Sequence, residues 1–120
     1  TGAQPMSQSV IDPHVFDELQ ANAGADFVIE LVDTFAEEAP ALLTEMRSAV
    51  LANGAAGAAE RFRRAAHSLK SNSHTFGATR MAEMARTLEL GGMPHDASGV
   101  DALAHEFATT LAALHALARA

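Results

Sequence analysis

Hydrophobic positions recur at spacings of three and four residues along most of the chain. The longest run lies between about residues 25 and 53 and consists of Val28, Leu31, Val32, Phe35, Ala39, Leu42, Met46 and Val50. This spacing places the side chains on one face of an α-helix, and Asn53-Gly54 is a typical helix end. Pro40 interrupts the run, but the apolar face continues in register on both sides. The pattern therefore predicts one kinked helix rather than two.

The same spacing predicts further helices on both sides of this one. A short helix should begin at Asp12-Pro13, with Asp as N-cap and Pro in the first position. Another should run from about 55 to 76 and stop at Gly77, and the next should end near Gly91.

The last predicted helix runs to the end of the chain from Ser98, which together with Asp101 resembles a capping box. No stretch alternates like a strand. The pattern predicts an all-α fold, an antiparallel four-helix bundle with a short N-terminal capping helix.

Length and composition fit a single domain. The chain has 120 residues, of which 48% are hydrophobic, enough to bury a core. The first nine residues, TGAQPMSQS, are small and polar. We therefore expect residues 1–9 to be a flexible tail or an expression remnant and residues 10–120 to form the bundle.

Charge and cysteine content narrow the function classes. The formal net charge of −7 disfavours general binding to nucleic acid or to anionic membranes. The absence of cysteine excludes disulfides, thiolate zinc sites and cysteine nucleophiles. No apolar run approaches the roughly 18 residues of a membrane span, and no export leader is evident. We expect a soluble cytoplasmic domain without a nucleic-acid or membrane partner.

The helix predicted at residues 55–76 carries the candidate chemistry. At about 100° per residue, one face of this helix is apolar and should face the core; it includes Ala55, Phe62, Ala66, Leu69, Ser73 and Phe76. A second stripe should face water, at spacings of four, three and four: Arg63, His67, Lys70 and His74. His67 is therefore predicted to be exposed rather than part of the core.

An exposed imidazole between cations is suited to phosphoryl transfer. Positive charges at Arg63 and Lys70, one turn away on either side, favour the neutral, nucleophilic form of the ring. They can also reach a group attached to it. Phosphoryl transfer depends mainly on positioning and charge stabilisation, and histidine can serve as the covalent carrier. The spacing alone also fits an ordinary solvated basic helix face.

The residue string around His67 resembles a known family. His67-Ser68-Leu69-Lys70, then Ser71-Asn72-Ser73 and Gly77-Ala78, is similar to the signature of histidine-containing phosphotransfer (HPt) domains, roughly H-x-[LI]-K-G-[SA]-[SA]-x-x-x-G-[AL]. The resemblance extends to "IDPHVFDEL", "FVIELVDTFAEEAPALLTEM" and "RFRRAAHSLK". It implies a bundle that carries a phosphoryl group between receiver-domain aspartates, belonging to response regulators or hybrid histidine kinases.

The resemblance also implies roles for single residues. His67 would accept the phosphoryl group on Nε2 and Lys70 would stabilise it. Arg63 and Arg64 would neutralise the acidic receiver surface.

Three more positions complete the implied site. Ser71 and His74 would lie at the partner interface, and Gly77 would be a structural helix stop. The chain departs from the family pattern at Ser71, where glycine is usual, and at Asn72, where serine or alanine is usual. A side chain at position 71 narrows the space that a partner must enter.

We expect neither a metal site nor a nucleotide site. His67 and His74 lie about 10 Å apart along the helix axis, and no Glu-x-x-His pair or glycine-rich nucleotide loop is present. The chain is therefore interpreted as a monomeric phosphoryl carrier rather than an enzyme, without a cofactor of its own and with Mg²⁺ supplied by the receiver. Two alternatives stay open: a degenerate adaptor that binds partners without phosphorylation, and the phosphoacceptor module of a chemotaxis-type histidine kinase.

Overall fold

Five α-helices make up the part of the chain that the structure, a computed structural model, describes, residues 10–119. They are α2 (Pro13–Ala23), α3 (Ala25–Leu51), α4 (Ala58–Phe76), α5 (Thr79–Leu90) and α6 (Ser98–Ala118). No strand occurs within this range, which confirms the all-α class. The predicted tail, residues 1–9, lies outside the described residues.

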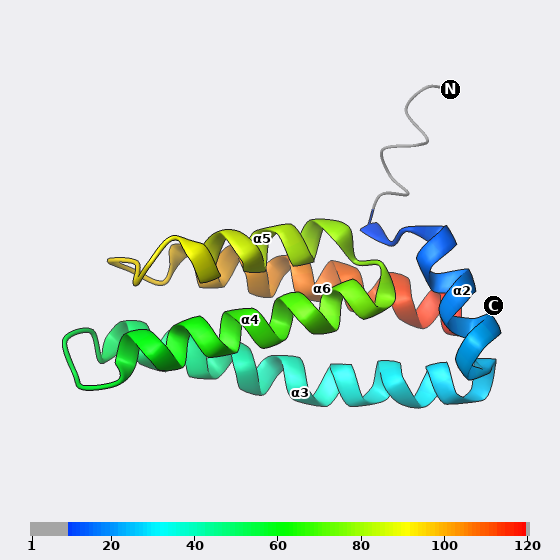
Figure 1. Cartoon of the computed structure of the whole chain (residues 1–120), viewed down its shortest axis with the longest axis horizontal. Helices are drawn as coiled ribbons and strands as arrows, with labels where there is room; N and C mark the ends of the chain where they lie inside the picture. Colours follow the sequence, from blue (N-terminus) through cyan, green and yellow to red (C-terminus); the bar gives the residue numbers. More distant parts are fainter. Residues whose placement is uncertain (1–9, 120) are drawn as a thin grey trace, which may run out of the picture.

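The four longer helices lie side by side, and α2 lies across one end of them (Figure 1). Helix α3 packs against α4 and α6, and α5 packs against the same two helices from the other side. The connections 52–57 and 91–97 lie at the end remote from α2, whereas the short turn from α4 to α5 lies at the α2 end (Figure 1). Successive helices are therefore antiparallel. The predicted four-helix bundle with a short capping helix is confirmed.

The buried faces of the helices meet in one core. Phe35 of α3 contacts Phe76 of α4 and Phe107 of α6, with ring centroids 5.3 Å apart in both pairs. The predicted apolar face of α3 is buried except at Leu31 and Leu42, which are half-buried, and next to Leu42 it is Leu43 that is buried. No helix among residues 10–119 is long and apolar enough to cross a lipid bilayer.

Helix α3 runs without interruption through Pro40, as the pattern predicted. Because Pro40 has no backbone N–H, the carbonyl oxygen of Ala36, one turn earlier, lacks its intrahelical partner. Pro40 is exposed and Ala36 is half-buried. A polar group in such a position can be solvated when it lies on the solvent side of a helix. One helix thus carries core residues on both sides of the proline.

The predicted helix starts match the structure in part. Asp12 is the N-cap of α2 as expected, because its carboxylate accepts a hydrogen bond of 2.9 Å from the His14 N–H. The capping box at the start of α6 is wrong. Ser98 is already helical, and Asp96 accepts hydrogen bonds from its N–H at 3.0 Å and its hydroxyl at 2.7 Å. Asp101 instead pairs with Arg47 of α3.

Helix α4 begins at Ala58, three residues later than predicted, and Ala55 is exposed rather than part of the core. The reason lies in two glycines. Gly54 and Gly57 have φ values of +98° and +82°, a left-handed conformation that breaks a right-handed helix. The apolar spacing extended into this turn by chance.

Candidate functional site

Helix α4 presents two faces of opposite character, as the sequence predicted. Its core face is buried and consists of Ala58, Phe62, Ala65, Ala66, Leu69, Ser73 and Phe76. On the other side, Arg63, His67 and His74 are exposed. The His67 side chain keeps 55% of its surface accessible. Burial of the first face therefore holds the imidazole at the surface near the middle of the helix.

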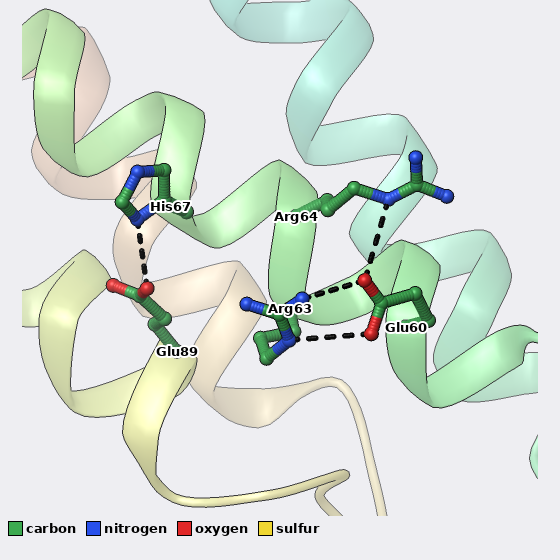
Figure 2. Close-up of polar contacts among 5 residues, drawn as sticks. All are labelled: Glu60, Arg63, Arg64, His67 and Glu89. Carbon is green, nitrogen blue, oxygen red and sulfur yellow. Dashed lines mark hydrogen bonds and ion pairs between the residues drawn. The ribbon is translucent and has the colours of Figure 1, made fainter.

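A carboxylate from the neighbouring helix holds the His67 ring. Glu89 lies in the last turn of α5, and its Oε2 is 2.8 Å from His67 Nδ1 (Figure 2). The Glu89 side chain is 10% exposed, far less than that of His67. The pair therefore has a nearly buried acceptor and an exposed ring, and the far side of the ring points away from Glu89 (Figure 2).

This contact selects one tautomer of the ring. An ionised carboxylate can accept hydrogen bonds but cannot donate them. Nδ1 of His67 must therefore carry the proton that it donates to Glu89. In the neutral ring the lone pair is then on Nε2. Glu89 thus leaves Nε2 as the nitrogen that can attack an electrophile.

Lys70 is drawn toward the same carboxylate. Its Nζ lies 3.0 Å from Glu89 Oε1, and its side chain is 23% exposed. The prediction that Lys70 points freely into water is therefore wrong. The hydrogen bond from Lys70, followed by that from His67, lowers the pKa of Glu89 below its usual value. Glu89 is consequently ionised at neutral pH, as the tautomer argument requires.

The lowered pKa predicts a pH-dependent contribution of Glu89 to stability. A carboxyl group with a depressed folded-state pKa stabilises the fold above its unfolded pKa, here 4.5, and loses that contribution as pH falls through the folded value. Wild type should therefore be more stable than Glu89→Gln at pH 7. The gap in melting temperature should close as pH falls below about 4.5. Thermal unfolding of both proteins across this range measures it, and a gap independent of pH would contradict the ion pair.

Arg63 and Arg64 do not lie free beside His67. Arg63 pairs with Glu60 through an Nη2 to Oε2 contact of 2.5 Å, and Arg64 Nε lies 3.7 Å from the same oxygen (Figure 2). The hydrogen bond from Arg63 is the largest cause that lowers the pKa of Glu60. One carboxylate is thus shared by two guanidinium groups, and the three side chains together carry one positive charge.

These contacts change the electrostatic argument from sequence. Arg63 and Lys70 flank His67 in the sequence as two cations, but each is paired with a carboxylate in the structure. Positive charge alone therefore does not support the predicted reactivity of His67. The hydrogen bond from Nδ1 to Glu89 supplies a more specific reason, since it orients the ring and fixes its tautomer.

Ser71 and His74 lie at the surface of α4, as the helical spacing predicted. Both are exposed on the same side of α4 as His67. No hydrogen bond joins the Ser71 hydroxyl to another residue in the described range, and the Ser71 carbonyl accepts a bond of 3.2 Å from the Thr75 hydroxyl. His74 borders a groove between α4 and α5. Both positions are accessible to a partner.

Gly77 ends α4 in the left-handed conformation, with φ of +77°, as predicted. Its N–H donates to the His74 carbonyl and the Ala78 N–H donates to the Ser73 carbonyl, at 3.1 and 2.9 Å. Gly77 has a second function that the sequence did not indicate. Its carbonyl accepts a 2.8 Å bond from the Asp12 N–H, and a Cβ at this position would lie 2.8 Å from the Val15 Cβ. Glycine therefore lets α2 approach the end of α4.

Glu89 is the site residue that sequence reasoning missed. A signal for it was present, because Glu89 is four residues after buried Ala85 and eight after buried Met81. A carboxylate on the apolar face of a helix is costly unless it is paired. Such a position predicts a partner on the adjacent helix. No group of three or more His, Asp or Glu suited to a metal ion occurs within residues 10–119.

Comparison with known proteins agrees with this geometry. A family comparison matches residues 30–118 to the Hpt domain. That range contains α4, α5 and α6 in full and most of α3. No curated protein and no solved structure matches the chain.

Proposed function

The chain belongs to the Hpt domain family, and on that premise we propose that it carries a phosphoryl group on His67 in a phosphorelay. His67 Nε2 would accept the group from an aspartyl phosphate of one receiver domain and pass it to another. The observation that supports this most directly is the exposed imidazole whose Nδ1 is held by Glu89 at 2.8 Å.

In the transfer step the lone pair of His67 Nε2 attacks phosphorus. The P–N bond forms as the bond between phosphorus and the aspartate oxygen breaks, and the aspartate leaves as a carboxylate. Nδ1 keeps its proton, so the phosphorylated ring gains positive charge, and the Glu89 carboxylate stabilises that charge. The reverse step restores the starting state. Mg²⁺ belongs to the receiver in this proposal.

Lys70 would stabilise the phosphoryl group without releasing Glu89. The ammonium group has three N–H donors, and it forms an ion pair with Glu89 Oε1 at 3.0 Å. A second N–H can reach an oxygen of a group on His67, one turn away on the same helix. Lys70 also offsets the repulsion between the phosphoryl group and the Glu89 carboxylate.

We expect phosphorylation by a receiver and none by ATP alone. The sequence has no glycine-rich nucleotide loop, so the group must come from a partner. Incubation with a phosphorylated receiver and Mg²⁺ should label the chain rapidly, and incubation with radiolabelled ATP should not. Absence of labelling by every receiver of the source organism would favour the adaptor alternative. Labelling by ATP alone would reveal a catalytic site of its own.

Ser71 tests where the receiver approaches. It is exposed one turn after His67, so Ser71→Leu should slow transfer severalfold while the melting temperature stays nearly the same, as for most surface substitutions. Ser71→Gly should maintain or quicken transfer, despite a helix cost of about 0.5 kcal/mol. Transfer rates of the three proteins with one receiver decide this. Normal transfer by the leucine variant would place position 71 outside the interface.

A further inference from the structure

A groove between α4 and α5 borders the exposed stripe that contains His67. It has a volume of about 630 Å³ and is lined by His74, Thr79, Arg80, Ala82, Glu83 and Arg86. Arg86 lies one helical turn before Glu89, the residue that holds His67. His74 lies two turns after His67 on α4, about 10 Å along the axis. A partner that covers His67 therefore also reaches this α5 groove.

The α5 groove contains an arginine, Arg86, that has no carboxylate partner in the described range. No ion pair or hydrogen bond joins the Arg86 guanidinium to another residue in the described range. Arg80 contacts Glu106 through Nε at 3.2 Å, but its side chain is 71% exposed. Glu83 is the acidic residue in the lining, against two arginines and His74. Arg63 and Arg64, by contrast, share Glu60.

The opposite side of His67 has a different character. There a groove between α3 and α4 is lined by Glu38, Ala41, Leu42, Ser68 and Asn72, a set with one acid and no cation. A second groove on the α3 side contains Arg61 and Arg64, but these two guanidinium groups pair with Glu45 and Glu60. Arg86, on the α5 side, is thus the cation beside this stripe that has no carboxylate partner in the described range, and it is available to an anionic surface.

We propose that the α5 groove binds acidic side chains of the receiver domain, with Arg86 as the residue that determines partner specificity. This inference rests on the proposed function. The family resemblance implies a receiver with an acidic surface, and the chain as a whole, at −7, repels such a surface. The guanidinium of Arg86 can bind a carboxylate through two parallel hydrogen bonds. It therefore steers the partner toward α5 and orients it over His67.

Charge reversal with a matched control tests the proposal. Arg86→Glu is compared with Arg119→Glu, which makes the same charge change at an exposed position at the end of α6, at the α2 end of the bundle (Figure 1). The readout is the rate of phosphoryl exchange with a receiver domain that exchanges with wild type. Arg86→Glu should slow exchange about tenfold or more at low salt, with a smaller loss at high salt, and Arg119→Glu should stay near wild type.

A second measurement separates docking from chemistry. The small donor phosphoramidate labels imidazoles without a protein partner, and it should label Arg86→Glu at the wild-type rate. Equal exchange by Arg86→Glu and wild type, or equal slowing in both variants, would overturn the role of Arg86 and leave the carrier function standing. A wild-type chain that is labelled by phosphoramidate but exchanges with no receiver would overturn the carrier function and, with it, this inference.

Discussion

His67→Gln should abolish phosphorylation by a receiver, whereas His74→Gln should retain most of it. Both imidazoles are exposed on α4, so accessibility does not distinguish them. The structure does, because His67 donates from Nδ1 to Glu89 at 2.8 Å and His74 has no such partner in the described range. His74 also lies in the last turn of α4, where the helix dipole presents partial negative charge that opposes a phosphoryl group.

The measurement is acid-labile label on each variant after incubation with a phosphorylated receiver. Circular dichroism and thermal unfolding of both variants serve as controls, because exposed substitutions usually change stability by less than about 0.5 kcal/mol. His74→Gln should weaken docking through the α5 groove, which reduces the rate without removing the final label. Label that survives in His67→Gln but disappears in His74→Gln would reverse the assignment.

Gly77→Ala should destabilise the fold by about 3 kcal/mol. An alanine in the left-handed conformation costs about 1–2 kcal/mol. Its Cβ would also lie 2.8 Å from the Val15 Cβ and 3.0 Å from the Asp12 carbonyl oxygen, and such overpacking adds about 1–3 kcal/mol. Relief of the clash requires α2 to move from the end of α4. Urea unfolding gives the free energy directly.

Gly57→Ala is the matched control for this prediction. Gly57 has a similar φ of +82°, but a Cβ there would meet no atom within 4 Å. The variant should therefore lose about 1–2 kcal/mol, the conformational part alone. The difference between the two variants isolates the contact with α2. Equal losses would show that α2 yields without cost and that Gly77 serves as a helix stop alone.

The features that sequence predicted depend on local periodicity. The apolar spacing of α4 was sufficient to place Leu69 in the core and His67 at the surface, because a helix converts spacing directly into angle. Asp12 and Gly77 marked helix ends because their preferences are set by the adjacent backbone. The predicted start at residue 55 was wrong for the same reason, because apolar spacing does not reveal that Gly54 and Gly57 have positive φ angles.

The features that sequence missed arise between helices. Lys70 lies on the outer side of α4 by angle, yet Glu89 of α5 draws it to 3.0 Å. The pairing of Glu89 with His67 joins residues 22 positions apart, and the approach of Val15 to Gly77 joins residues 62 positions apart. Such contacts depend on how helices pack. The angular positions of residues around one helix contain no information about the neighbouring helix.

The groups that hold the His67 ring all come from one helical hairpin. His67 and Lys70 lie on α4 and Glu89 lies on α5, and the two helices are joined by a turn of two residues, Gly77 and Ala78. Contacts this close in sequence form early and at low entropic cost during folding. The connections 52–57 and 91–97 lie outside this hairpin. Insertions in these two loops should therefore be tolerated with the ring geometry intact, which makes them suitable places to attach a fluorophore or to circularly permute the chain.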